Sequence, residues 1–270
     1  MKRFLASGFF ALGFAVMLAA PADAGLFEDG NAAFHQGDVA TALSLWKQAS
    51  EHGDAKAETN LGYLYHQGQG VPQDYAQALV WYSKAAQQGD AHAEANLGYM
   101  LDQGQGTAQN HAQAVVWYTK AAEQGDLEAE DNLGTIFAQG QGVARDYVQA
   151  FKWFGKAAEL GIADAEANLG ALYEQGEGTP QNYSDAIAWY GKAASLGSPI
   201  AQDSLGSMYQ QGLGTPQDPA QGHMWFEVAA NQGYPDAVRH LNTLTAQMTP
   251  AQLAQSQKLE ADWIAKFPPQ

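Results

Sequence analysis

The stretch Ser44-Leu45-Trp46-Lys47 matches S-x-x-K, the acylation motif of serine β-lactamases and penicillin-binding proteins. Acyl transfer by a serine nucleophile is therefore the first chemistry to consider. The companion motifs S-D-N and K-T-G do not occur in the sequence. A four-residue motif with two free positions also arises often by chance. We therefore predict that the chain is not an enzyme, and keep a β-lactamase or penicillin-binding activity as an alternative.

Histidines are the other candidates for chemistry, and the chain has seven: His35, His52, His66, His92, His111, His223 and His240. Zinc sites use His, Cys or carboxylate ligands at short, regular spacings. None of these histidines stands four residues from another, and the chain has no Cys. We therefore expect no metal site and no cofactor, and we expect the histidines to be polar surface side chains.

Gly-x-Gly pairs recur in the sequence and resemble phosphate-binding loops. They are Gly68/Gly70, Gly104/Gly106, Gly140/Gly142, Gly176/Gly178 and Gly212/Gly214. They follow predicted helices instead of strands, and no Lys-Ser/Thr pair follows them, so the dinucleotide-binding and P-loop contexts are missing. We interpret these pairs as turns.

The first residues have the pattern of a signal peptide. Lys2 and Arg3 precede an apolar run over residues 4–20, and Ala22-Asp23-Ala24 forms a small-x-small cleavage site. We expect residues 1–24 to be removed after Ala24 and the protein to be exported, to the periplasm or the medium. An uncleaved membrane anchor is the alternative. Without Cys, the chain has no disulfide and no lipid attachment site.

The charge of the chain limits its partners. Cleavage removes two of the 13 basic and one of the 29 acidic residues, so the net charge changes from −16 to −17. Such a surface repels nucleic acid and anionic lipid and favours neutral or cationic partners. No second apolar run approaches the length that spans a bilayer, so we expect no stable membrane insertion after cleavage.

A 36-residue repeat dominates the rest of the sequence. It is marked by Trp81, Trp117, Trp153, Trp189 and Trp225, and with the same spacing by Gly62, Gly98, Gly134, Gly170 and Gly206. A period of this size predicts a solenoid built from one supersecondary unit. Both halves of the unit have apolar residues at helical intervals. Each half is too short to be a stable helix alone, so each unit must pack against the next.

Several residues of the unit have predicted structural roles. Gly62 lies inside the first helix, where a neighbouring helix should cross without room for a Cβ. Gly68 and Gly89 should end the two helices in the left-handed conformation. Asp54, Asp90 and Asp126 should cap the next helix. The lysines of the Lys-Ala-Ala segments, Lys84, Lys120, Lys156 and Lys192, should lie over the Trp-Tyr surface.

The pattern A-x-x-N-L-G-x-x-Y-x-x-G-x-G-[VT]-P-x-[DN]-Y-x-x-A-x-x-W-[YF]-x-K-A-A-x-x-G resembles the Sel-one-like repeat branch of the tetratricopeptide superfamily. The resemblance implies an all-α, right-handed solenoid of antiparallel helix pairs. Full repeats are expected at residues 55–90, 91–126, 127–162, 163–198 and 199–234. A shorter tetratricopeptide-like hairpin should precede them at 25–54, and a half-repeat with a capping helix, starting at Thr249-Pro250, should follow at 235–270.

The resemblance also implies that the first helix of each pair lines a concave groove that binds peptides. The predicted binding residues are Lys56, Asn60, Tyr63, Asn96, Tyr99, Asp131, Asn132, Asn168 and Asp203. The asparagines would hold a peptide main chain, because an amide both donates and accepts, or would bridge neighbouring helices. The tyrosines would accept apolar side chains. Asp131 and Asp203, with Glu128, Asp164, Asp102 and Glu174 nearby, would form an acidic wall that prefers Lys or Arg.

The leading hypothesis is an exported scaffold or adaptor that binds a protein or peptide segment in this groove, with basic residues in the partner as a further expectation. Two alternatives remain at this point. One is the β-lactamase-like activity of Ser44. The other is a cell-wall or polysaccharide-binding module that uses Tyr63 and Tyr99.

Overall fold

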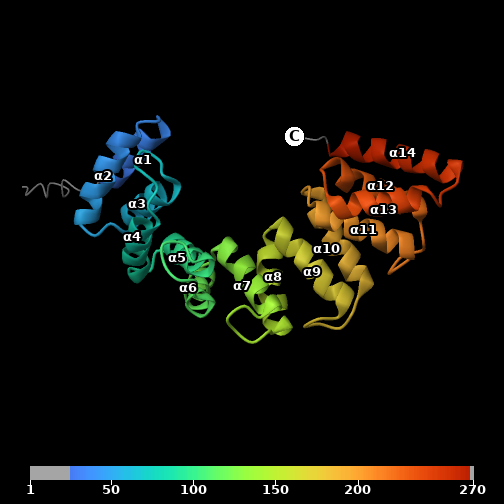
Figure 1. Cartoon of the computed structure of the whole chain (residues 1–270), viewed down its shortest axis with the longest axis horizontal. Coiled ribbons are helices and arrows are strands. Elements are labelled where there is room, and N and C mark those ends of the chain that lie inside the picture. Colours follow the sequence, from blue (N-terminus) through green and yellow to red (C-terminus); the bar gives the residue numbers. More distant parts are fainter. Residues whose placement is uncertain (1–24, 268–270) are drawn as a thin grey trace, which may run out of the picture.

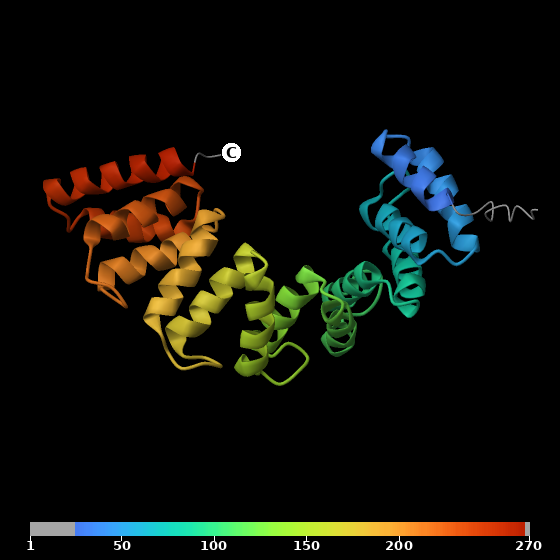
Figure 2. The same ribbon diagram turned by 180° about the vertical axis from the view of Figure 1, so that it is seen from behind.

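The computed structural model describes residues 25–267, and over this range the chain forms helices and no strand. The helices stack pair by pair along a curved axis, so the molecule is an open crescent with its first and last helices at opposite tips (Figures 1 and 2). The predicted all-α solenoid of helix pairs is confirmed. The predicted signal peptide, residues 1–24, lies outside the described residues.

Helices of 10 to 17 residues, most of them 13 residues long, form the stack. In chain order they are α1 (Leu26–His35), α2 (Val39–Glu51), α3 (Ala55–Gln67), α4 (Tyr75–Gln87), α5 (Ala91–Gln103), α6 (His111–Glu123), α7 (Leu127–Gln139), α8 (Tyr147–Glu159), α9 (Ala163–Gln175), α10 (Tyr183–Ser195), α11 (Pro199–Gln211), α12 (Pro219–Asn231), α13 (Pro235–Thr245) and α14 (Pro250–Lys266). Up to α12, each odd-numbered helix pairs with the next helix, and each pair packs on the following one. Both α13 and α14 pack on α12.

Short polar side chains fix where many of these helices begin. Asp54, Asp90 and Asp126 each accept a hydrogen bond from the backbone N–H three residues later, as their positions predict. The last helix begins with a capping box between Thr249 and Gln252. Because these caps recur with the repeat, they keep equivalent side chains in register along the stack.

Gly62 marks the point where the two helices of a repeat cross. A Cβ added to Gly62 would lie 2.6 Å from the ring of Tyr82 on α4, and one added to Gly134 would lie 2.5 Å from the ring of Phe154. The predicted close crossing is therefore confirmed. Gly68 then ends α3 with a φ of 69°, in the left-handed region that favours glycine.

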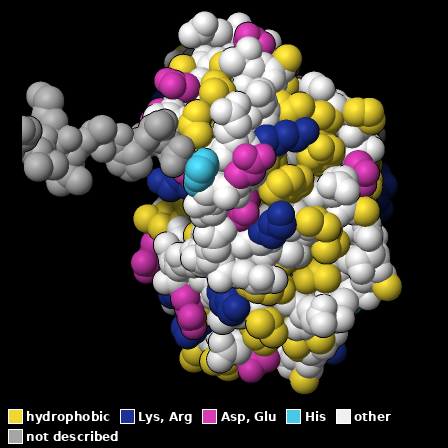
Figure 3. Space-filling view, turned by 90° about the vertical axis from the view of Figure 1, so that its left-hand side faces the viewer, with side chains coloured by type: hydrophobic (Ala, Val, Ile, Leu, Met, Phe, Trp, Pro, Cys, Tyr) yellow, Lys and Arg dark blue, Asp and Glu magenta, His cyan; other side chains and the backbone are white. Residues whose placement is uncertain are grey.

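The core is a layer of Ala, Leu and aromatic side chains within and between the pairs. The repeated tryptophans belong to this core or pack against it, and lysines lie over the first four of them as predicted. Lys84 Nζ lies 4.3 Å from the Trp81 ring centroid, and Lys192 Nζ lies 3.5 Å from that of Trp189. Figure 3, which faces the tip that carries the N-terminal helices, shows hydrophobic and basic side chains next to one another on the surface.

The tryptophan of the last full repeat is covered by a helix in place of a lysine. Val228 stands 36 residues after Lys192, at the same repeat position. Its neighbour Trp225 is covered by Trp263 of α14, and the two ring centroids are 4.6 Å apart. Helix α14 therefore closes the C-terminal end of the core.

No helix within residues 25–267 is long and apolar enough to cross a lipid bilayer.

Candidate functional site

The odd-numbered helices form the inner layer of the crescent. Helices α3, α5, α7, α9 and α11 contact one another from pair to pair, and among the described residues no contact of that extent joins the even-numbered helices from α2 to α12. In a curved stack, the layer whose helices approach one another more closely lies on the concave side. The predicted binding residues all belong to this layer: Lys56, Asn60, Tyr63, Asn96, Tyr99, Asp131, Asn132, Asn168 and Asp203. We call the surface of this layer the concave face.

Exposed aromatic rings lie at the N-terminal half of the concave face. Tyr63 is 43% exposed and Tyr99 is 40% exposed. The Tyr63 ring packs edge-on against Phe34 of α1, with 6.5 Å between centroids, and the Tyr99 ring packs edge-on against His66, at 6.2 Å. Both rings are supported by the protein and remain partly in solvent. They can therefore pack against apolar side chains of a partner.

Asparagines occupy the same position on four successive inner helices, but they are not equivalent. Asn60 Nδ2 donates to Asn31 Oδ1 of α1 at 3.0 Å, and Asn96 Nδ2 donates at 2.7 Å to a backbone carbonyl one turn earlier in α5. Asn132 and Asn168 are half-buried and make no side-chain hydrogen bond within residues 25–267. The first two amides thus bond within the protein, and the last two keep both donor and acceptor for a ligand.

Asp131 of α7 carries a buried carboxyl oxygen without a partner. Its Oδ1 atom makes no hydrogen bond in the described part of the chain. Burial raises the pKa of the Asp131 carboxyl to about 6, and the nearby Asp164 carboxylate contributes to the rise. A buried carboxylate without a donor is destabilised relative to water. An N–H group or a cation from a ligand would relieve that cost.

Asp203 differs from Asp131, although the sequence predicted one acidic wall for both. Asp203 Oδ1 lies 2.8 Å from His240 Nδ1 of α13, and the aspartate side chain is buried. Burial raises the pKa of Asp203, and the hydrogen bond from His240 lowers it. The terminal half-repeat therefore already supplies a donor to this carboxylate.

Two other acids of the predicted wall, Asp102 and Glu174, already have hydrogen-bond partners within the protein. Asp102 Oδ1 lies 2.6 Å from His111 Nδ1 of α6, and Glu174 Oε2 accepts a hydrogen bond from the Tyr190 hydroxyl of α10 at 2.7 Å. Both acids are therefore already paired with side chains of even-numbered helices. The acidic part of the concave face is therefore centred on Asp131, with Asp164 beside it.

The S-x-x-K motif lies on the first hairpin, away from the repeats that carry Asp131. Ser44 and Lys47 are both exposed on α2, and Ser44 Oγ accepts a hydrogen bond from Gln48 Nε2 at 3.4 Å. The serine is thus paired with an amide and not with Lys47. Lys56 is exposed in the first turn of α3. Within residues 25–267, no three His, Asp or Glu side chains are grouped so as to hold a metal ion.

His223 is buried, which corrects the expectation that the histidines are surface side chains. Its Nδ1 lies 2.9 Å from Ser256 Oγ of α14, and its Nε2 lies 2.9 Å from Thr245 Oγ1 of α13. Burial lowers the pKa of the imidazole, and Glu260 raises it. The ring joins three terminal helices. The local sequence contains no signal for this, because the burial depends on where α14 packs.

The sequence did not lead us to predict a ladder of buried acids, one at the same position of each of four successive repeats. Its members are Glu58, Glu94, Glu130 and Glu166, and burial raises the pKa of each. Gln88 and Gln124 donate to the first two acids at 2.6 and 2.7 Å. The signal in the sequence was the recurrence of an acid every 36 residues, together with a recurring Gln in the closing turn.

Comparison with known proteins identifies the repeat. The model of the Sel1 repeat matches residues 24–54, 55–90, 91–126, 127–162, 163–198 and 199–234, so it includes the short first hairpin. The crystal structure of a Sel1 repeat protein from Oxalobacter formigenes has a TM-score of 0.72 and 31% sequence identity, and the match covers 89% of this chain and 99% of that one. No curated protein matches the sequence.

A second solved structure is a protective antigen present in uropathogenic Escherichia coli strains, which displays an SLR fold. Its TM-score is 0.83 at 34% identity, and the match covers 91% of this chain and 54% of that chain. The present chain thus spans about half the length of the Escherichia coli protein. The family model covers most of the present chain as six consecutive units. The chain belongs to the Sel1 repeat family, within the tetratricopeptide-like superfamily.

Proposed function

We propose that this protein is an exported scaffold that binds a peptide or protein segment along its concave face. Sel1 repeat proteins are generally protein–protein interaction scaffolds, and this chain is a Sel1 repeat protein. The observation that carries the proposal is the set of polar side chains without partners on α7 and α9: Asp131, Asn132 and Asn168. The export part rests on the signal-peptide pattern of residues 1–24.

In the proposed binding mode, different inner helices contact different parts of the bound segment. Tyr63 and Tyr99 pack against apolar side chains of the bound segment. Asn132 and Asn168 bond to its main chain, where one amide satisfies both a C=O and an N–H. Asp131 pairs with a Lys or Arg side chain. The net charge, −16 for the full chain and −17 after the predicted cleavage, adds a long-range attraction to such a segment.

A selected peptide tests this proposal. A random peptide library is selected against residues 25–270, and the affinity of the strongest binder is measured by calorimetry. The double variant Asn132→Ala/Asn168→Ala should weaken binding about tenfold or more, because it removes hydrogen bonds worth about 1 kcal/mol each. The matched control is Gln77→Ala/Gln113→Ala, which removes two exposed amides from α4 and α6. Equal affinity of the two double variants would contradict the proposal.

The variant Asp131→Asn should raise the stability of the protein and lower its affinity for the peptide, so it separates binding from folding. Asp131 has its pKa raised from 3.8 to about 6, so the folded state binds the proton more tightly than the unfolded state does. The stability contribution of Asp131 is therefore fully present below pH 3.8 and is lost as the pH rises through 6. At pH 7 the variant should gain up to about 3 kcal/mol of stability, at 1.36 kcal/mol per pH unit.

At pH 4 the gain in stability of Asp131→Asn should be small. The same variant should bind a selected peptide that contains Lys or Arg more weakly, by about fivefold or more for one partly desolvated ion pair. A variant with higher stability and unchanged affinity would show that Asp131 does not contact the ligand.

A further inference from the structure

The last full repeat differs from others at the first residue of its second helix. Tyrosines begin α4, α8 and α10, whereas Pro219 begins α12. In two of those repeats the tyrosine hydroxyl accepts a hydrogen bond from a glutamine that stands two residues earlier. Gln73 Nε2 donates to Tyr75 and Gln181 Nε2 donates to Tyr183, both at 3.1 Å. The ring and the amide thus form a recurring unit at the loop edge of the solenoid.

The last repeat keeps the glutamine of this unit and lacks the ring. Gln217 Nε2 donates to the Gln210 carbonyl at 2.8 Å, as Gln73 Nε2 donates to the His66 carbonyl at 2.9 Å. An amide nitrogen carries two N–H groups. The second one, which bonds to Tyr75 in the first full repeat, makes no such bond at Gln217. The Tyr75 ring also packs against His66, at 5.3 Å between centroids. The equivalent space in the last repeat lies between Gln210 and Gln217.

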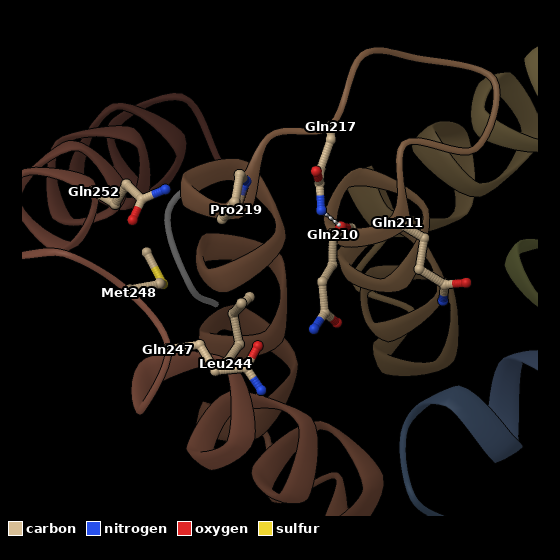
Figure 4. A pocket seen from close by; sticks show the side chains of 8 residues that line it. All are labelled: Gln210, Gln211, Gln217, Pro219, Leu244, Gln247, Met248 and Gln252. Carbon is tan, nitrogen blue, oxygen red and sulfur yellow. Dashed lines mark hydrogen bonds between the residues drawn. The ribbon is translucent and has the colours of Figure 1, made fainter.

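A pocket of about 540 Å³ lies at this place, where α11, α12 and the turn between α13 and α14 meet (Figure 4). Its apolar lining is Pro219, Leu244 and Met248. The rest of the lining is a set of amide side chains: Gln210, Gln211, Gln217, Gln247 and Gln252. No charged side chain lines it, in a chain with a net charge of −16. The lining therefore suits a neutral group with an apolar body and a hydrogen-bonding tip.

We propose that this pocket receives a tyrosine side chain of a partner protein, in the place that the chain's own tyrosines occupy in other repeats. The ring packs on Pro219, Leu244 and Met248, and its hydroxyl oxygen accepts the second N–H of Gln217. Gln252 is oriented by Thr249, whose backbone N–H and hydroxyl both donate to its Oε1, so its own N–H groups remain as further donors. The pocket uses none of the residues proposed to bind the peptide, so its test is independent of the proposed function.

The test is a titration of the whole protein with N-acetyl-tyrosinamide, followed through the methyl signals of ¹³C-labelled methionines. Met248 lines the pocket, whereas Met100 of α5 is fully buried elsewhere and serves as an internal control. We expect a saturable shift of the Met248 signal with a Kd of about 1 mM, in the range of a ligand of this size. N-acetyl-phenylalaninamide should bind about five to ten times more weakly, because it lacks the hydroxyl.

Three variants make the test specific. Pro219→Tyr places the tyrosine of the other repeats in the pocket and should abolish the Met248 shift. His111→Tyr, the same substitution at the equivalent position of α6, should leave it unchanged. Gln217→Leu, whose pocket stays open, should remove the preference for the tyrosine amide over the phenylalanine amide. No Met248 shift in the native protein, a shift that persists in Pro219→Tyr, or a neutral disaccharide that binds more tightly than the tyrosine amide would overturn the proposal.

Discussion

Glu166 is the member of the buried acid ladder with the least support, and its replacement gives a sharp prediction. Glu58 and Glu94 each accept a hydrogen bond from a glutamine in the closing turn, and Glu130 Oε1 lies 3.6 Å from Lys156 Nζ. The glutamine's place beside Glu166 is taken by Leu196, which is 56% exposed. Glu166 Oε2 is buried without a hydrogen-bond partner in the described chain.

The size of the effect follows from these contacts. Leu196→Gln restores the missing donor, and a hydrogen bond to a charged group contributes about 1.5–3 kcal/mol. Ordering a glutamine side chain costs up to about 1.5–2 kcal/mol, so a net gain of about 1 kcal/mol is expected. Glu166→Gln relieves the same defect by removing the buried charge, and loses the weak attraction of Lys192. It should also gain about 1 kcal/mol at pH 7.

Urea unfolding, with a thermal scan for comparison, measures these gains. A gain of 1 kcal/mol corresponds to a rise in Tm of about 2–4 °C for a chain of this size. Burial raises the pKa of Glu166, so the stability contribution of its carboxyl is fully present below pH 4.5 and is lost as the pH rises through the folded-state pKa. The advantage of Glu166→Gln should therefore fade in acid.

The matched control for Leu196→Gln is its reverse in the first full repeat. Gln88→Leu removes the donor to Glu58 and should destabilise the protein by about 1 kcal/mol or more. The double variant Glu166→Gln/Leu196→Gln should gain less than the sum of its parts, since both changes relieve one defect. The last full repeat already has such a pair, in which Gln232 Nε2 donates to Gln202 Oε1 at 2.6 Å. Unchanged stability in both Leu196→Gln and Gln88→Leu would refute this reasoning.

Two further predictions concern helix crossing and the terminal helices. Gly134→Ala should lower the free energy of unfolding by about 1–3 kcal/mol, because the added Cβ would overlap a buried aromatic ring. The control is Gly155→Ala in α8, where an added Cβ meets nothing within 4 Å. In the same denaturation assay this variant should gain up to about 1 kcal/mol of stability. Burial lowers the pKa of His223, although Glu227 lies 3.6 Å away and Glu260 raises the pKa. The contribution of His223 to stability is therefore present above pH 6.5 and is lost as the pH falls below it. The stability difference between the native protein and His223→Gln should therefore shrink between pH 7 and 5.5, and a constant difference would contradict the assignment.

The repeat made most of the fold predictable. Trp81 and its successors fix the period, and the positions of Gly62, Gly68 and Asp54 predict a helix crossing, a helix end and a cap that the structure confirms. These features depend on residues close together in the chain or on the same position of the next unit. Local patterns of this kind are visible without coordinates.

The electrostatic details of the site were not predictable in the same way. The sequence could assign Asp203 to an inner helix, but not show that His240, 37 residues later, would lie beside it. The burial of His223 likewise depends on the packing of α14 on α12. Such pairs are set by how helices from different units meet, and a single sequence carries no periodic signal for them.

The most direct test of the concave-face proposal is to locate a bound peptide on the protein. A library-selected peptide with a photoreactive residue is cross-linked to residues 25–270, and the attachment sites are mapped by mass spectrometry. The proposal predicts attachment to the odd-numbered helices α3 to α11, concentrated near Asp131, Asn132 and Asn168, and loss of that attachment in Asn132→Ala/Asn168→Ala. Attachment mainly to the even-numbered helices or to α14 would contradict it.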